Sequence, residues 1–303
     1  MPDDTAHHRW LDPKLLGAVS KLEFKTRKIV EGTRLGRHRS PFHGISVEFA
    51  EHRPYVPGDD VRHVDWKIYA KRDRFFIKQY EEETNLAATL LLDVSSSMGY
   101  RSDAGGLFKL DYAKFMAAAL AFLLIEQQDA VGLVAFDGGV VKSFPPKAST
   151  PHFRALCAAL EEVRGGERTD LGAVLDRAAG EIDRRGLVVV LSDLVDEPGR
   201  VLAGLQRVAH RRHELVVLHV MDGDEIDFPF RGAVRFEDLE GDERFTCDAR
   251  DLRAAYLAAL EEHCARIRTG CRELGIDYMR MDTREPLDVA LTGYLNLRAR
   301  RPR

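Results

Sequence analysis

Several features that would assign a chemistry at once are missing from this sequence. Only four cysteines occur among 303 residues, and they lie far apart with no CxxC pair. Neither a zinc knuckle nor a disulfide framework is therefore expected, and reduced thiols in a core fit better. No phosphate loop of the GxxxxGK type occurs either, which argues against ATP hydrolysis by this chain.

The sequence also lacks an excess of charge and a long hydrophobic run. Its 45 basic and 49 acidic side chains leave a formal charge of −4, so no general attraction to nucleic acid or acidic membranes is expected. The longest apolar stretch, residues 115–125, is too short to span a membrane and suits a buried helix. Because the first residues are polar and acidic, we expect no secretory signal, no integral membrane span and a cytoplasmic location.

What the sequence does contain, from about Leu86, is an alternation of short apolar runs with longer amphipathic ones. Largely apolar or β-branched runs of strand length occur at residues 87–92, 131–136, 187–191, 214–220 and 276–281. Such runs are typical of parallel strands that helices cover on both faces. The pattern predicts an α/β fold with a doubly wound, mostly parallel, Rossmann-like sheet.

Further elements are predicted around these strands. A weaker run at 140–144 is expected as an edge strand that forms a hairpin with the strand before it. Apolar residues recur at helical spacing over 108–123, 153–163, 171–182 and 252–274. We interpret the apolar residues of these stripes as core residues. Cys264 and Cys271, which lie on the last stripe, are then small buried hydrophobes.

Residues 1–85 have a different character. We expect a helix over about 13–30, then a basic stretch and a turn-rich, highly charged segment that ends in a strand at 75–80. That strand could add to the edge of the main sheet. The chain therefore divides into an N-terminal charged arm, residues 1–85, and an α/β domain with a C-terminal helical elaboration, residues 86–303.

A group of oxygen-bearing side chains follows the first strand of the predicted sheet. Asp93, Ser95 and Ser97 alternate along the loop after that strand. In open α/β sheets ligands bind outside the carboxyl ends of the strands, where the chain order reverses. One carboxylate and two hydroxyls on one side of a tight loop are the ligand types that a hard cation prefers. The loop therefore predicts a site for one divalent ion.

Two further donors are expected at the same edge of the sheet. Thr169 precedes a predicted helix, and Asp193 follows the strand at 187–191. Taken alone, each feature is as well explained by a helix cap. Because all of them fall at strand ends or helix starts, we favour a metal site for Mg2+, with Mn2+ or Ca2+ as alternatives. An open coordination position would be filled by water or by a partner's Glu or Asp.

These residues resemble the metal-ion-dependent adhesion site of von Willebrand factor A domains, which combines a DxSxS motif, a Thr on a second loop and an Asp on a third. By that resemblance Ser95, Ser97 and Thr169 would be direct or switchable ligands, and Asp93 and Asp193 would act largely through bound water. The fold implied is von Willebrand factor A-like.

The arm resembles a bacterial family known as domain of unknown function 58. Its sequence SVEFAEHRPYVPGDDVRHVDWKIYAKRDRFFIKQYEEE carries the likeness. FPFRGAVRFEDLEG, LRAAYLAALEEHC and GIDYMRMDTREPLDVALTGYL continue it, so it covers roughly residues 40–300. Many members are membrane-anchored, and this chain departs from them in that respect. The resemblance implies co-operation with a MoxR-type AAA+ ATPase in the assembly or activation of client proteins.

Two enzyme classes compete with a binding module as explanations of the loop that follows the first strand. A phosphotransferase of the haloacid dehalogenase type needs a second carboxylate two residues after its first Asp, where this chain has Ser95. A serine hydrolase elbow needs Gly two residues before its nucleophile, and neither Ser95 nor Ser97 has one. We therefore expect no catalytic residues, and keep a metal-dependent hydrolase or phosphotransferase as the alternative.

Three further segments could be mistaken for sites. The run 222–227 lacks the Gly of an EF-hand at its sixth position, so we interpret it as a solvated acidic turn. A second metal site in the arm is less favoured than ion pairing; its acidic residues are Glu48, Asp59, Asp60 and Asp65. A nucleic-acid module, also less favoured, would use the arm's basic residues with interleaved aromatics, namely Arg34, Arg37, Arg39, Lys71, Arg72, Arg74, Trp66, Tyr69 and Phe75.

Overall fold

The computed structural model describes most of the chain, in two compact units. The described residues are 47–54, 66, 68–69, 75–82, 86–102, 106–166, 171–182, 185–239 and 244–299. The smaller unit is Arg37–Leu86, and the described part of the larger unit begins at Ala87. The predicted helix over 13–30 and the basic residues at 34–39 lie outside the described residues, as do Asp59, Asp60, Asp65, Lys71, Arg72 and Arg74.

The smaller unit contains an antiparallel pair of strands, β1 (Val47–Pro54) and β2 (Phe76–Glu82). The sequence suggested that the strand at 75–80 could add to the edge of the main sheet. That suggestion is wrong, because this strand, β2, pairs with β1 in a separate two-stranded sheet. Three aromatic side chains of this unit pack together: Tyr69 stacks on Phe75 at 4.4 Å between ring centroids, and Trp66 meets both edge-on.

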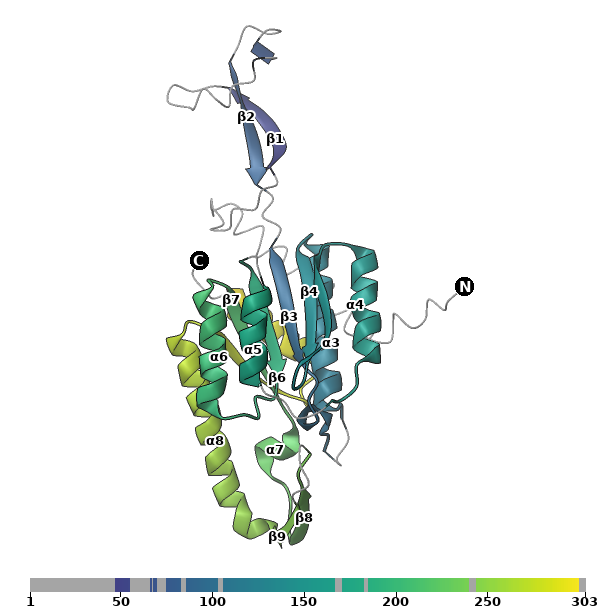
Figure 1. Ribbon diagram of the computed structural model, residues 1–303, viewed down its shortest axis with the longest axis vertical. Helices are drawn as coiled ribbons and strands as arrows, with labels where there is room; N and C mark the ends of the chain where they lie inside the picture. The colour runs from purple at the N-terminus through teal and green to yellow at the C-terminus, as the bar shows by residue number, and fades with distance from the viewer. Residues whose placement is uncertain are drawn as a thin grey trace, which may run out of the picture. The chain divides into compact units, whose positions relative to one another are not determined.

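The larger unit is built on a six-stranded sheet with the order β10-β7-β6-β3-β4-β5 (Figure 1). Five strands are parallel, and β5 runs antiparallel to β4 at one edge. The strands are β3 (Ala87–Asp93), β4 (Ala130–Phe136), β5 (Val140–Lys147), β6 (Leu187–Ser192), β7 (Glu214–Met221) and β10 (Asp277–Asp282). From β3 the chain winds to one side and then, from β6, to the other, which makes the sheet doubly wound.

Helices cover both faces of this sheet, as the apolar strand runs require. Helices α5, α6 and α8 pack on one face, whereas α3, α4 and α9 belong to the other (Figure 1). Their bounds are α3 (Lys109–Glu126), α4 (Thr150–Glu162), α5 (Leu171–Glu181), α6 (Pro198–His210), α8 (Ala249–Glu273) and α9 (Leu287–Ala299). Within the described ranges, no helix has the length and apolar character needed to cross a bilayer.

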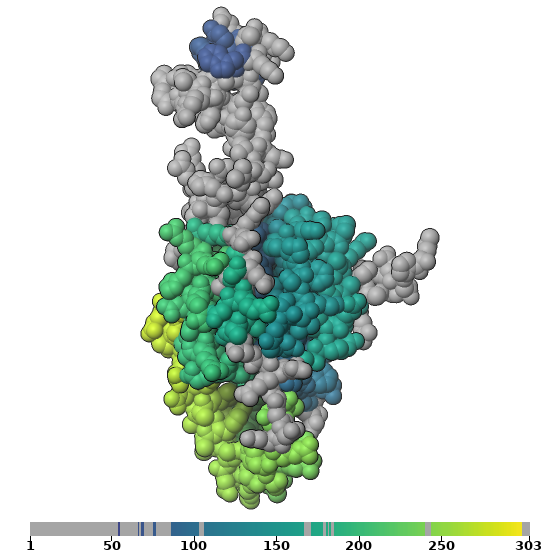
Figure 2. Space-filling model, viewed as in Figure 1, coloured from purple at the N-terminus to yellow at the C-terminus, as the bar shows by residue number. Residues whose placement is uncertain are grey.

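Between β7 and α8 the chain forms a short helix, α7 (Gly223–Asp227), and a hairpin of β8 (Ala233–Glu237) and β9 (Arg244–Asp248). These elements lie beyond the end of the sheet at which β7 finishes, and together with α8 they form the green and yellow-green end of the domain (Figure 2). Aromatic side chains from this segment and α8 pack on one another, with Phe228 contacting Phe230, Phe236 and Tyr256.

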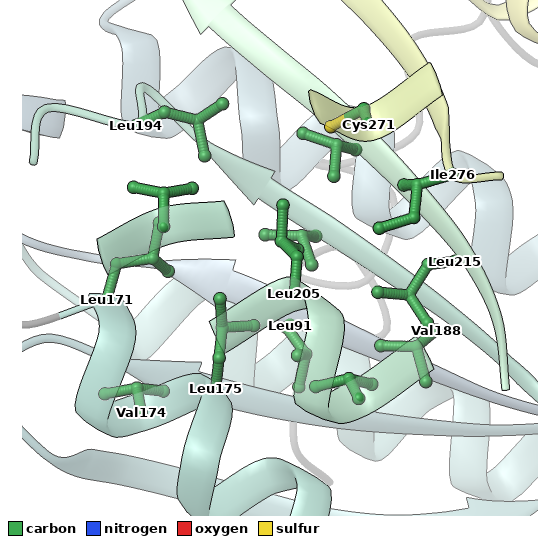
Figure 3. Close-up of a cluster of buried hydrophobic side chains, with 14 of the residues drawn as sticks. Leu91, Leu171, Val174, Leu175, Val188, Leu194, Leu205, Leu215, Cys271 and Ile276 are labelled. Carbon is green, nitrogen blue, oxygen red and sulfur yellow. The ribbon is translucent and has the colours of Figure 1, made fainter. Parts of the chain in front are cut away.

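The core between the sheet and the α5, α6 and α8 layer shows why the strands are apolar without interruption (Figure 3). Alternate strand residues such as Leu91, Val188 and Val190 point into this layer and are fully buried. Their neighbours Leu90 and Val189 are buried as well, on the opposite face. Burying each such side chain contributes about 1.5–3 kcal/mol relative to exposure. A strand buried on both faces therefore has no polar alternation.

The sequence-based elements agree well with this architecture. All six strands predicted for the main sheet are present, including the antiparallel edge strand, and each of the four predicted helical stripes forms a helix. Cys157, Cys264 and Cys271 are buried free thiols, and Cys247 is partly buried. Helices α6, α7 and α9 and the β8–β9 hairpin were not predicted.

Gly132, in the middle of β4, is required by the neighbouring edge strand. The register between β4 and β5 shifts between Val131 and Leu133, opposite the two consecutive prolines of β5. Proline has no N–H to donate, so it disturbs the ladder and is confined to edges and bulges. A Cβ at position 132 would lie 2.7 Å from the carbonyl oxygen of Phe144 and 3.0 Å from the backbone nitrogen of Pro146.

We therefore predict that Gly132→Ala destabilises the protein, because the backbone of β5 must move away. Overpacking of this kind typically costs about 1–3 kcal/mol, measurable as a lower midpoint of urea unfolding. Gly139→Ala is the matched control, since a Cβ there meets nothing within 4 Å. Equal midpoints for both variants would contradict the close approach of β5.

Candidate metal centre

The candidate site lies where the winding of the sheet reverses. Asp93 is the last residue of β3 and Asp193 follows the last residue of β6. These two strands are parallel neighbours, with Leu92 opposite Leu191. Their carboxyl ends therefore deliver both carboxylates to one point, the switch point at which ligands bind in doubly wound sheets. The two carboxylates lie close enough to interact electrostatically.

The loop after β3 is held in place by backbone hydrogen bonds on both sides. The N–H of Val94 donates to the carbonyl of Phe136 at 2.7 Å, and the N–H of Gly166 donates to the carbonyl of Val94 at 2.6 Å. Gly166 belongs to the segment that leads toward Thr169. Thr169 itself lies outside the described residues, so its role as a ligand stays a prediction.

The loop folds around the Asp93 carboxylate. The N–H of Ser95 donates to Asp93 Oδ1 at 2.9 Å, and the hydroxyl of Ser192 donates to Asp93 Oδ2 at 2.6 Å. The Oγ atoms of Ser95 and Ser97 lie 3.0 Å apart, and Ser97 helps to hold the pKa of Asp193 below its usual value. Four of the predicted site residues thus converge, and each is less than 10 % exposed.

The loop after β6 is strained. Leu194 has a φ of 54°, in the left-handed region that a branched side chain rarely adopts. Its side chain is fully buried in the core, and its N–H donates to the hydroxyl of Ser192 at 2.9 Å. This conformation turns the chain immediately after Asp193. Packing and the Ser192 hydrogen bond together hold the turn, which costs of order 1–3 kcal/mol.

Burying two carboxylates together has an electrostatic consequence. Burial, followed by the charge of Asp193, raises the pKa of Asp93 to about 6, although hydrogen bonds from Ser192 and Ser95 oppose this. Burial alone would also raise the pKa of Asp193, but the ammonium group of Lys109 outweighs it and holds that pKa below its usual value. The two carboxylates therefore differ in how strongly they hold a proton.

Lys109 is a member of this site that sequence reasoning missed. It is the first residue of α3 and is only 1 % exposed. Its Nζ atom donates to Asp193 Oδ2 at 2.8 Å and to Glu225 Oε1 at 2.7 Å. The available signal was its position three and four residues before the buried Tyr112 and Ala113, on the apolar stripe of the helix. A charge on that stripe must be buried and paired.

Glu225 comes from the segment interpreted as a solvated acidic turn, and that interpretation is wrong. Asp222 is 1 % exposed and caps α7, with its Oδ1 accepting from the N–H of Asp224 at 2.9 Å. Glu225 completes a capping box, because its Oε2 accepts from the N–H of Asp222 at 2.7 Å. Thr283 also donates to Asp222, at 3.1 Å. These carboxylates are used within the protein.

A cavity of about 1020 Å3 lies beside Asp193, Glu225 and His219, which contribute to its wall. The other lining residues come from the loop before α6 (Val195, Asp196 and Glu197), from α6 (Arg200), from the end of β7 (Met221) and from α8 (Tyr256, Leu260 and His263). Burial lowers the pKa of His219 to about 4, so its ring is neutral, and Nδ1 lies 2.7 Å from the hydroxyl of Tyr278.

The donor set fits a hard cation. Two carboxylates and two hydroxyls are oxygen ligands of the type that Mg2+, Mn2+ and Ca2+ accept. In the described part of the chain no group of three or more His, Cys, Asp or Glu side chains is placed to hold a metal, which leaves zinc-type ligation without support there. A divalent ion beside Asp93 would also favour its ionised form despite burial.

A doubly wound α/β domain with a DxSxS loop at its switch point is a von Willebrand factor A-like domain. The family model described as "Protein of unknown function DUF58" matches residues 51–266. The chain belongs to this family.

Individual relatives and solved structures were also found. The uncharacterized proteins Rv1480 of Mycobacterium tuberculosis and Mb1516 of Mycobacterium bovis are each 29 % identical over 267 residues, covering 86 % of this chain and 83 % of theirs. Among solved structures, the conserved hypothetical protein BatB of Bacteroides thetaiotaomicron has a TM-score of 0.47 and 15 % identity, covering 71 % of this chain and 97 % of that one. The SpRpn10 VWA domain has a TM-score of 0.40 and 13 % identity, covering 70 % and 95 %.

The raised pKa of Asp93 predicts how stability depends on pH in the absence of metal. Between about pH 4 and 6 the folded state binds a proton that the unfolded state has released, so this carboxyl costs stability as the pH rises through that window. Asp93→Asn removes the charge. At pH 7.5 in chelator we expect it to raise the free energy of unfolding by about 2 kcal/mol, a gain that shrinks toward zero near pH 4.

Urea unfolding at several pH values measures this gain. Asp251→Asn, on the exposed first turn of α8, is the control for loss of an acidic side chain and should not reproduce this gain. A destabilised Asp93→Asn variant at pH 7.5 would show that the hydrogen bonds to Asp93 outweigh its charge, contrary to this prediction.

Proposed function

We propose that this chain is a metal-dependent protein-interaction module. The ion, Mg2+ in the first instance, is held by Asp93, Ser95, Ser97, Thr169 and Asp193. The observation that carries the proposal is the convergence of two carboxylates and two hydroxyls at one buried switch point. A remaining coordination position would take a Glu or Asp of a partner protein, so that binding of partner and metal are linked.

The hydrogen bonds of the site favour binding over nucleophilic catalysis. A catalytic serine needs a general base within hydrogen-bond reach. The Oγ atoms of Ser95 and Ser97 lie 3.0 Å apart, and the nearby carboxylate of Asp193 is already paired with the ammonium group of Lys109. The nearby imidazole of His219 is directed instead at Tyr278. A hydrolase or phosphotransferase remains the second candidate and would require turnover of a substrate that is lost in Asp93→Ala.

For the partner, we propose a MoxR-type AAA+ ATPase together with a client protein. Support comes from membership of the family and from the family resemblance that links such domains to these ATPases. The smaller unit, with Trp66 60 % exposed and Phe75 45 % exposed, offers a surface that could select the partner. Aromatic side chains of this kind are enriched at protein interfaces.

Isothermal titration with Mg2+, Mn2+ and Ca2+ tests the metal site. We expect saturable one-site binding by the wild type and affinity at least about tenfold weaker in Asp93→Ala and in Ser95→Ala, each of which removes an oxygen donor. Asp129→Ala, at the opposite edge of the sheet just before β4, should bind as the wild type does. Equal heats for all four proteins would refute the site.

Surface plasmon resonance with a purified MoxR-type ATPase tests the partner. A chelator is a poor control here, because it also removes Mg2+ from the ATPase. The comparison is therefore wild type against Ser95→Ala in the same Mg2+ buffer, and we expect binding to fall about tenfold or more when the metal site is lost. Binding that does not distinguish the two proteins would place the interface elsewhere on the chain.

A further inference from the structure

Lys109 occupies a position that disfavours a positive charge in two ways. It is 1 % exposed, and the effective cost of burying an ammonium group is several kcal/mol. It is also the first residue of α3, where the helix dipole is positive and stabilises anions. An apolar side chain would fill this position more cheaply. The charge therefore needs a reason beyond packing.

The carboxylates of Asp193 and Glu225 hold this charge in place, at 2.8 and 2.7 Å from Nζ. Burial alone would lower the pKa of Lys109, but these two carboxylates keep it above its usual value, so the side chain remains an ammonium ion. Glu225 is itself fixed by the N–H of Asp222 in the capping box. The ammonium group is thus locked to a carboxylate of the candidate metal site.

Lys109 also determines the net charge around that site. Counted by formal charge, Asp93, Asp193 and Glu225 contribute three negative charges, and Lys109, which contacts two of these carboxylates, reduces the total to −2, which one divalent ion cancels. Burial raises the pKa of Glu225, and its ion pair with Lys109 opposes that effect. Without Lys109 the total would be −3, which favours any cation more strongly and a trivalent cation most. Without the charge of Glu225 it would be −1.

We propose that Lys109 and Glu225 act as a charge-setting pair, which fixes the affinity of the metal site and how strongly it discriminates between divalent and trivalent ions, without either residue contacting the metal. Lys109 would act on the metal site through Asp193, which it contacts, and Glu225 would act through Lys109. This inference rests on the proposed function, since it concerns metal bound at the same loop.

Three variants isolate charge from structure. Lys109→Met keeps the apolar stem of the side chain and removes the ammonium group. Glu225→Gln keeps a capping box, because Gln can accept the Asp222 N–H as Glu does, and removes the carboxylate charge. The double variant restores the total of −2 with neither charge present. A purely structural role would make the double variant at least as weak in metal binding as either single variant.

The full chain is titrated with Mg2+ by calorimetry and with Tb3+ by sensitised luminescence, at one ionic strength. We expect Lys109→Met to bind Mg2+ about tenfold tighter or more and Glu225→Gln to bind it weaker by a similar factor, with the double variant returning close to the wild type. Because Coulomb energy scales with ion charge, each change should be larger for Tb3+ than for Mg2+.

The outcomes separate this proposal from the metal site itself. If the wild type binds no ion, both proposals fail together. If the wild type binds Mg2+ and Ser95→Ala abolishes binding, but Lys109→Met and Glu225→Gln both weaken it, the site stands and the charge-setting pair is overturned. Should Lys109→Met fail to fold, the double variant decides: affinity near that of the wild type supports the pair, and affinity no better than that of Glu225→Gln overturns it.

Discussion

The parallel pairing of β3 with β6 brings Asp93 and Asp193 together in the interior, and the surrounding structure has to accommodate these two like charges. An isolated buried carboxylate is costly, and two side by side are more so. Each of the two carboxylates is stabilised by different partners. Hydroxyl and backbone donors from the neighbouring loops hold Asp93, and the ammonium group of Lys109 pairs with Asp193.

The ion pair between Lys109 and Asp193 constrains helices α3 and α7, which lie outside the loop itself. Helix α3 must begin with its lysine against the switch point, although the helix dipole opposes a cation there. A second carboxylate is then needed, and α7 supplies it as Glu225 immediately after β7. Because Glu225 serves both as counter-ion and as cap, the electrostatics of the site and the local fold of α7 are inseparable. The segment between β7 and α8 is thereby connected to the candidate metal loop.

The parts of the fold that the sequence predicts are those fixed by local pattern. Largely apolar runs identify the strands of the main sheet, the edge strand β5 by a weaker run, and helical periodicity identifies α3, α4, α5 and α8. The DxSxS loop could be placed because strand order puts Asp93 and Asp193 at one edge. The predictions that failed concern residues whose surroundings depend on contacts between segments far apart in the sequence. Glu225 looks like a solvated acid until Lys109 is known to lie beside it. The helical stripe indicates that Lys109 is buried, but no local pattern shows which carboxylates pair with it.

The ion pair between Lys109 and Asp193 is also relevant to whether the site holds a metal ion or catalyses a reaction. Catalytic centres shift pKa values so that a group can gain or lose a proton near neutral pH. Here Lys109 holds its proton firmly, Asp193 releases its own readily, and His219 is neutral and directed at Tyr278. Asp93, by contrast, has a pKa raised to about 6, and a bound divalent ion would favour its charged form. Fixed charges beside a loop of hydroxyl groups are the arrangement that holding a cation requires, which supports the proposed metal-binding role.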